Sequence, residues 1–87
     1  MTKQPKLPRL RPVNLRHAGA DGIWYDTGLI EIEKTLKGRR RLDTLIHEMF
    51  HEMCPEWTES RVRARTKRLT AFLWKHRVRV IESNSKE

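Results

Sequence analysis

The sequence His47-Glu48-Met49-Phe50-His51 constrains the fold of this chain more than any other stretch. Two histidines four residues apart lie on one face of a helix, one turn apart, so both imidazoles can bind one small cation. Zn²⁺ is the usual ion for nitrogen ligands in tetrahedral geometry. Apolar residues recur around the motif at helical spacing, which predicts an amphipathic helix and not a loop. These residues are Leu42, Leu45, Ile46, Met49, Phe50 and Met53.

Glu48 directly follows the first histidine of the motif. Beside a zinc-bound water, a carboxylate at this position can take the water's proton and pass it to a leaving group, so Glu48 is the predicted general base. The motif fixes only three positions, and many proteins carry it without a metal. The alternative is that His47 and His51 are ordinary half-buried histidines of a core helix.

Length, charge and cysteine content limit the kind of protein that this helix can belong to. With 87 residues the chain forms one small domain, to which a bound metal could add stability. The net charge of +8 suits contact with nucleic acid, although basic residues also solvate a small domain. Cys54 is the only cysteine, which excludes an internal disulfide framework and fits a reducing compartment.

No apolar run approaches the length of a membrane span, and no signal-peptide segment opens the chain. We therefore expect a cytoplasmic protein with no membrane partner.

Short alternating segments in the first third of the chain predict a small sheet. Residues 1–12 contain three prolines among Lys and Arg, and we expect them to form a flexible basic arm. Residues 13–17, 23–25 and 29–33 have strand-like patterns and are separated by turns that contain glycine. Strands joined by such short turns favour an antiparallel meander.

Two helices are predicted to follow the strands. The motif helix should run from about residue 40 to residue 53, because Pro55 disfavours helical geometry at Cys54. Thr58 is a good N-cap for a second helix, which should extend to about His76. Only a few residues join the two helices, so they should form an antiparallel hairpin.

The predicted fold is α+β, with a small antiparallel sheet of about three strands packed on a helical hairpin. One domain should cover residues 13–82. Residues 78–81 suggest a short final strand or an extended tail that packs on the domain, and residues 83–87 are expected to be a disordered tail.

A catalytic zinc site needs a third protein ligand and an open position for water. In the hairpin, the end of the first helix lies beside the start of the second, which brings His51 close to Glu59. Glu59 also shares a helix face with Val62 and Thr66, and a carboxylate on a buried face should have a partner. We therefore predict Glu59 as the third ligand.

Three alternatives to this ligand follow from the same stretch. Glu59 could interact only with the dipole of its helix, as acidic residues near a helix N-terminus commonly do. Glu56 is close in sequence but falls in the turn, so the direction of its side chain is not predictable. Cys54 lies on the side of the two histidines, but a straight helix places it roughly 10 Å in rise from His47, and a small buried hydrophobe is the more natural role.

The order His47-Glu48-x-x-His51, then a short turn, then Glu59 on a following helix resembles the gluzincin arrangement of zinc metallopeptidases. The span 28–74 is similar to the very small zincin-like proteins coded by phages and prophages, including SprT-like and minimal gluzincin types. This resemblance covers about half of the chain. It implies a metallopeptidase that hydrolyses peptide bonds of a peptide or protein substrate with a Glu-activated zinc-bound water.

The resemblance also implies a role for each matching residue. His47, His51 and Glu59 would bind Zn²⁺, and Glu48 would be the general base. The strand at residues 29–33 would be the edge strand along which a substrate peptide lies, a recognition mode that many peptide-binding proteins share.

The chain departs from full peptidases of this kind, which carry additional Tyr or His groups that stabilise the oxyanion. Here the only tyrosine is Tyr25, and the remaining histidines are His17 and His76. Tyr25 is a candidate for this role, or an aromatic residue that packs on the core. His76 more naturally interacts with the carbonyl groups at the end of its helix.

Two functions without catalysis are also compatible with the sequence. The first is a basic nucleic-acid-associated domain with a structural or vestigial zinc site, which would use the arm, residues 39–41 and the arginine-rich second helix. The second is a structural zinc domain with a closed shell of four ligands and no exchangeable water.

Overall fold

The computed structural model describes residues 6–81 and contains a sheet of three strands and two long helices. The strands are β1 (Arg9–Val13), β2 (Gly22–Tyr25) and β3 (Leu29–Glu33), arranged in the order β1-β3-β2. The sheet is mixed, because β2 pairs with β3 antiparallel and β1 pairs with β3 parallel. The α+β class and the three strands are therefore confirmed, whereas the expected antiparallel pairing is wrong for β1.

The central strand β3 provides the buried apolar face of the sheet. Ile30 and Ile32 alternate along it and are both buried, as expected for one face of a pleated strand. In the register of the sheet Trp24 pairs with Ile30 and Gly22 pairs with Ile32, so these two β2 residues lie on the same face. This face carries the first helix.

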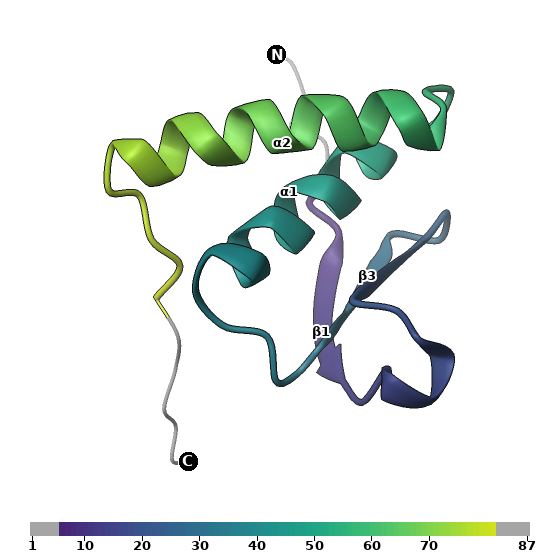
Figure 1. Ribbon diagram of the computed structural model, residues 1–87. Coiled ribbons are helices and arrows are strands. Elements are labelled where there is room, and N and C mark those ends of the chain that lie inside the picture. The colour runs from purple at the N-terminus through teal and green to yellow at the C-terminus, as the bar shows by residue number, and fades with distance from the viewer. Residues whose placement is uncertain (1–5, 82–87) are drawn as a thin grey trace.

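The helices α1 (Gly38–Met53) and α2 (Glu59–Lys75) form the predicted hairpin. Figure 1 shows three layers, with α1 between the sheet and α2. α1 ends two residues before Pro55, and α2 begins where the Thr58 hydroxyl accepts a hydrogen bond from the backbone N–H of Arg61 at 3.2 Å. The second helix ends near His76 as predicted. Neither helix of the described part of the chain is long and apolar enough to cross a membrane.

The core is small and lies between these layers. Its buried apolar residues come from the sheet, from the loops beside it and from both helices. They are Leu15, Ile30, Ile32, Leu36, Leu42 and Val62. α2 adds buried Thr66 and Thr70, one and two turns after Val62. The face of α2 that packs against α1 is therefore partly polar.

The first strand lies earlier in the chain than the sequence predicts. A strand was expected at residues 13–17, but β1 covers residues 9–13, and residues 16–18 form a short 3-10 helix. The flexible arm predicted at residues 1–12 is therefore wrong for residues 9–12, and residues 1–5 lie outside the described part. The Arg9 N–H donates to the Gly28 carbonyl at 2.8 Å, and the Lys34 N–H donates to the Val13 carbonyl at 2.8 Å. β1 pairs with β3, which is far away in the sequence, so the residues around β1 carry no local pattern that predicts this strand.

One further expectation about the sheet is corrected, and one of the two alternatives for the tail is excluded. β3 was expected to be an edge strand, but it is the central strand, and β2 is the edge strand next to α1. Residues 78–81 form no strand; they continue from α2 without regular structure. The turn into them is made by Arg77, which has a φ of 66°, and by a hydrogen bond from the Val78 N–H to the Leu73 carbonyl at 2.9 Å. The disordered tail predicted at residues 83–87 lies outside the described residues.

Candidate metal centre

The helical hairpin brings His47, His51 and Glu59 together, as predicted. The two histidines lie one turn apart on α1, and the short turn returns the chain so that Glu59, the first residue of α2, faces them. Glu59 Oε1 lies 2.8 Å from His51 Nε2, and Glu59 Oε2 lies 3.0 Å from His47 Nε2. The two imidazoles are 18% and 19% exposed, so the site is accessible from solvent on one side.

These three side chains form a group that could hold a metal ion. Their ligand atoms all lie within 4.8 Å of one another. Two ligand atoms at tetrahedral angles around one Zn²⁺ are about 3.4 Å apart. The contacts of 2.8 and 3.0 Å, which the two histidines make with different oxygens of Glu59, are shorter than this spacing, and the ligand atoms of the group lie at most 4.8 Å apart. Two imidazole nitrogens and one carboxylate therefore fit one metal ion, as predicted for His47, His51 and Glu59.

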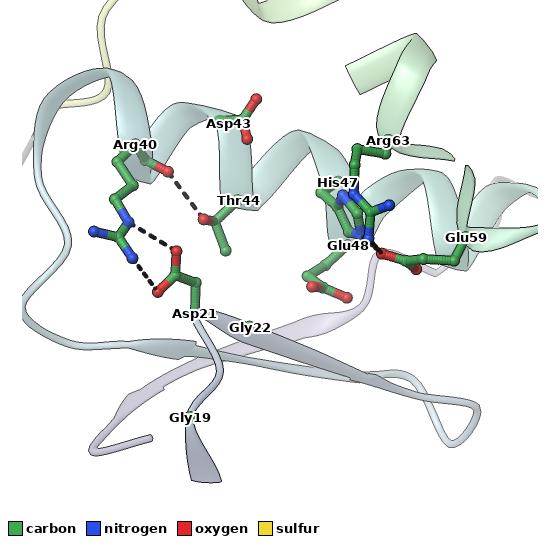
Figure 2. Close-up of a pocket in the computed structure, with 10 residues that line it drawn as sticks. All are labelled: Gly19, Asp21, Gly22, Arg40, Asp43, Thr44, His47, Glu48, Glu59 and Arg63. Atoms are coloured by element: carbon green, nitrogen blue, oxygen red, sulfur yellow. Dashed lines mark hydrogen bonds and ion pairs between the residues drawn. The ribbon is translucent and has the colours of Figure 1, made fainter. Parts of the chain in front are cut away.

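Glu48 lies beside this group on the face of α1 that is turned to the sheet (Figure 2). Its side chain is buried, at 6% exposure, and packs against Gly22 of β2. Burial disfavours the charged carboxylate, and the negative charge of Glu59 adds to this effect, so the pKa of Glu48 is raised to about 7. A carboxyl group with this pKa can both accept and release a proton near neutral pH.

A polar pocket of about 460 Å³ opens beside the group of His47, His51 and Glu59. His47, Glu48 and Glu59 line one end of it, together with Arg63 of α2 (Figure 2). At the other end Arg40 donates two hydrogen bonds to the Asp21 carboxylate, at 2.8 and 2.9 Å. Gly19, Gly22, Asp43 and Thr44 complete the lining.

A second hollow lies beside the same group and is aromatic. It is lined by Trp24 of β2 and by Pro55 and Trp57 of the turn, and it shares Gly22, His47, Glu48 and Glu59 with the polar pocket. The Trp24 indole N–H donates to the Glu52 carboxylate at 2.7 Å, and its ring stacks on the His51 ring with centroids 6.1 Å apart. Trp24 therefore helps to fix the orientation of the His51 ring.

The alternative ligands do not join the group of three. Glu56 is exposed in the turn, and Cys54 is half-buried at the end of α1; neither belongs to the cluster that could hold a metal ion. The alternative that Glu59 serves only the helix dipole is also incomplete, because both of its carboxylate oxygens contact histidines.

The three side chains considered for oxyanion stabilisation lie away from the ligands. The Tyr25 hydroxyl donates to Glu31 at 3.0 Å on the opposite face of the sheet from Trp24. His76 follows the far end of α2, where it packs on Phe72 with ring centroids 4.6 Å apart. His17 is exposed in the 3-10 helix.

Arg63 and Trp24 line the candidate site but were not predicted from the sequence. Arg63 follows Glu59 by four residues, and this spacing on a helix could have identified it. Trp24 shares a strand face with Gly22, but only the structure shows that this face is turned to the motif helix.

The chain has no match among protein-family models, curated proteins or solved structures in the comparisons made. The resemblance to zincin-like peptidases therefore rests on the motif residues themselves.

Proposed function

We propose that the protein is a zinc-dependent metallopeptidase that hydrolyses peptide bonds. The observation that carries this proposal is the meeting of His47, His51 and Glu59 around one point, with the buried carboxyl group of Glu48 beside them. His47, His51 and Glu59 would hold the ion. When bound at such a site, Zn²⁺ lowers the pKa of a water molecule and polarises a carbonyl group.

Glu48 performs the proton transfers in this proposal. A water molecule adds to the carbonyl carbon of the peptide bond, the new C–O bond forms, and the π electron pair of the carbonyl moves onto its oxygen. Glu48 accepts the proton that the water loses. The C–N bond then breaks, and Glu48 passes this proton to the leaving nitrogen, so the products are a carboxylic acid and an amine.

The edge of β2 offers a place for the substrate backbone. β2 is an edge strand of the sheet and borders α1, and within residues 6–81 no strand pairs with its outer backbone N–H and C=O groups. An extended peptide can pair with such an edge. Gly22 and Trp24 of this strand line the two hollows on either side of the ligands, so a peptide along β2 would pass the proposed zinc site.

The test compares the wild-type chain with Glu48→Gln and with Glu56→Gln, an exposed carboxylate that serves as the matched control. All three are loaded with zinc and given a mixture of unstructured peptides. Glu48→Gln is expected to bind zinc with the wild-type stoichiometry and to lose turnover by about 10²–10⁴-fold, because general base catalysis is removed. Glu56→Gln should cleave as the wild type does. Undiminished cleavage by Glu48→Gln would contradict the proposal.

Nucleic-acid binding is a second candidate function, and the outer side of α2 favours it. Arg61, Arg65 and Arg68 are exposed there, and none of them has a carboxylate partner within the described residues. Arg61 and Arg65 lie over the Trp57 ring, at 5.2 and 5.8 Å from its centroid, which holds their charges near each other. Arg40, by contrast, is paired with Asp21 and contributes less free charge.

The salt dependence of binding to a DNA duplex tests this second function. Each phosphate contact contributes about −0.9 to the slope of log K against log salt concentration. Replacing Arg61, Arg65 and Arg68 with alanine is therefore expected to reduce the slope by up to about three, whereas replacing Lys6, Arg9 and Arg11 near β1 should change it less. An unchanged slope in the α2 variant would exclude this surface.

For both functions we propose a cytoplasmic setting, since Cys54 has no second cysteine with which to form an internal disulfide.

A further inference from the structure

Arg63 is the cationic side chain of α2 that reaches the proposed ligands. Its Nη2 donates to Glu59 Oε2 at 3.1 Å, and the same oxygen lies 3.0 Å from His47 Nε2. One carboxylate oxygen thus contacts both the guanidinium group and a ligand imidazole. The positive charge of Arg63 therefore borders the place where the ion would be held (Figure 2).

Most of the hydrogen-bonding capacity of Arg63 is still available. A guanidinium group has five N–H donors, and the contact with Glu59 is the one that Arg63 makes within the described residues. Its side chain is 59% exposed and lines the polar pocket next to Glu48. Arg40 lines the same pocket, but its Nε and Nη2 both donate to Asp21.

We propose that Arg63 binds and stabilises the oxyanion that forms when water adds to the substrate carbonyl. This inference rests on the proposed peptidase function. It assigns a residue to the group that stabilises the oxyanion, which the sequence did not identify. The π electron pair of the carbonyl moves onto its oxygen in that step, so a cationic donor placed there favours the transition state. Tyr25, His17 and His76 lie elsewhere, and Arg63 is the side chain at the ligands with the right charge and free donors.

A purely structural role for Arg63 would have a different signature. If the residue served only to hold Glu59, its loss would weaken zinc binding and leave anion binding by the zinc-loaded protein unchanged. If it binds the oxyanion, its loss weakens the binding of a tetrahedral anion even when zinc is fully bound. Methylphosphonate is a suitable probe, because its tetrahedral phosphorus carries negatively charged oxygen atoms and it has no peptide bond to hydrolyse.

The experiment uses the full chain as wild type, Arg63→Ala, Arg63→Lys and Lys67→Ala. Lys67 is an exposed cation one turn further along α2 and outside the polar pocket, so it is the matched control. Zinc affinity is measured by competition with a chelator, methylphosphonate affinity by calorimetry on the zinc-saturated protein, and kcat and KM on a cleaved peptide.

Arg63→Ala is expected to bind methylphosphonate about 10–100-fold more weakly, as loss of a charge-assisted hydrogen bond implies. Its kcat should fall by about 10²–10³-fold with a smaller change in KM. Arg63→Lys should recover part of both, and Lys67→Ala should behave as the wild type. Wild-type methylphosphonate affinity in Arg63→Ala overturns the inference, as does a wild-type protein that binds zinc but no methylphosphonate. If the wild type cleaves no peptide, the peptidase proposal fails, and the methylphosphonate comparison still decides whether Arg63 is an anion-binding residue.

Discussion

Gly22 of β2 and Glu48 of α1 lie so close together that a Cβ atom on Gly22 would be 2.9 Å from Glu48 Oε2. The same Cβ would be 2.8 Å from Thr44 Cγ2, one turn earlier on α1. Real Cβ atoms essentially never approach other heavy atoms this closely. The absence of a side chain at position 22 therefore lets the edge strand pack directly against the face of the helix that carries the proposed base.

Gly22→Ala is expected to destabilise the protein by about 1–3 kcal/mol, since it overpacks the contact between β2 and α1. Either the strand or the Glu48 side chain must move, so turnover should fall as well while zinc is still bound. Urea unfolding and zinc stoichiometry measure the two effects.

The variant Thr44→Ser is the informative partner, because it removes Cγ2 and keeps the hydroxyl that donates to the Arg40 carbonyl at 2.9 Å. In the double variant with Gly22→Ala we expect part of the stability to return. The Glu48 contact is still present there, so turnover should stay low. A Gly22→Ala protein as stable and as active as the wild type would contradict the close approach.

Glu59→Gln tests the third ligand. A neutral amide is a poor zinc ligand, and the positive charge of Arg63 beside it would lose its partner. We expect zinc affinity to fall by at least tenfold in a competition with a chelator. Glu56→Gln removes the other carboxylate that the sequence offered for this role and should leave zinc affinity unchanged. If the effects of the two variants are reversed, the ligand assignment is wrong.

Removal of the proposed metal should lower the stability of the whole domain, because the three proposed ligands join α1 to the start of α2. A ligand present at a hundredfold excess over its Kd stabilises the folded state by about 2.7 kcal/mol. In a domain of this size, that corresponds to a shift in Tm on the order of 10 °C. Calorimetric melting with and without a chelator measures the shift. His47→Ala should melt at the same temperature under both conditions, and a chelator effect that persists in this variant would place the metal elsewhere.

The parts of the fold that follow from local patterns were predictable from the sequence. The two helices, the Pro55 boundary, the Thr58 cap and the meeting of His47, His51 and Glu59 all depend on spacing along a helix or on a short turn. Their physical causes act over a few residues, so the sequence displays them.

The features that were missed depend on contacts between distant segments. The pairing of β1 with β3 joins Arg9 to Leu29, although β2 comes between these two strands in the sequence. Nothing near residue 9 predicts this pairing. The ion pair of Arg40 with Asp21 joins residues 19 apart, on α1 and in the loop before β2. Such contacts depend on the packing of the whole domain, which a periodic pattern does not encode.

Glu33 anchors the loop after β1, and its charge should make the protein sensitive to acid. Its side chain is 1% exposed, and its Oε1 accepts a hydrogen bond from the Leu15 N–H at 2.6 Å. Oε2 accepts from the Thr35 hydroxyl at 2.8 Å and the Thr35 N–H at 3.2 Å. The Leu15 bond first, then the Thr35 bonds and the nearby charge of Arg16, lower the pKa of Glu33 below its ordinary value of 4.5, although burial opposes them.

A carboxyl group whose pKa is lower in the folded than in the unfolded state stabilises the fold above the unfolded value. We expect this contribution to be complete at neutral pH and to be lost as the pH falls below about 4.5 and through the lower folded value. Glu33→Gln should therefore be less stable than the wild type at pH 7, and its stability should change less between pH 5 and pH 3. Urea unfolding at several pH values measures both, with Glu56→Gln as the exposed control that keeps the wild-type slope. An acid dependence that is the same in Glu33→Gln and the wild type would show that these hydrogen bonds do not couple Glu33 to folding.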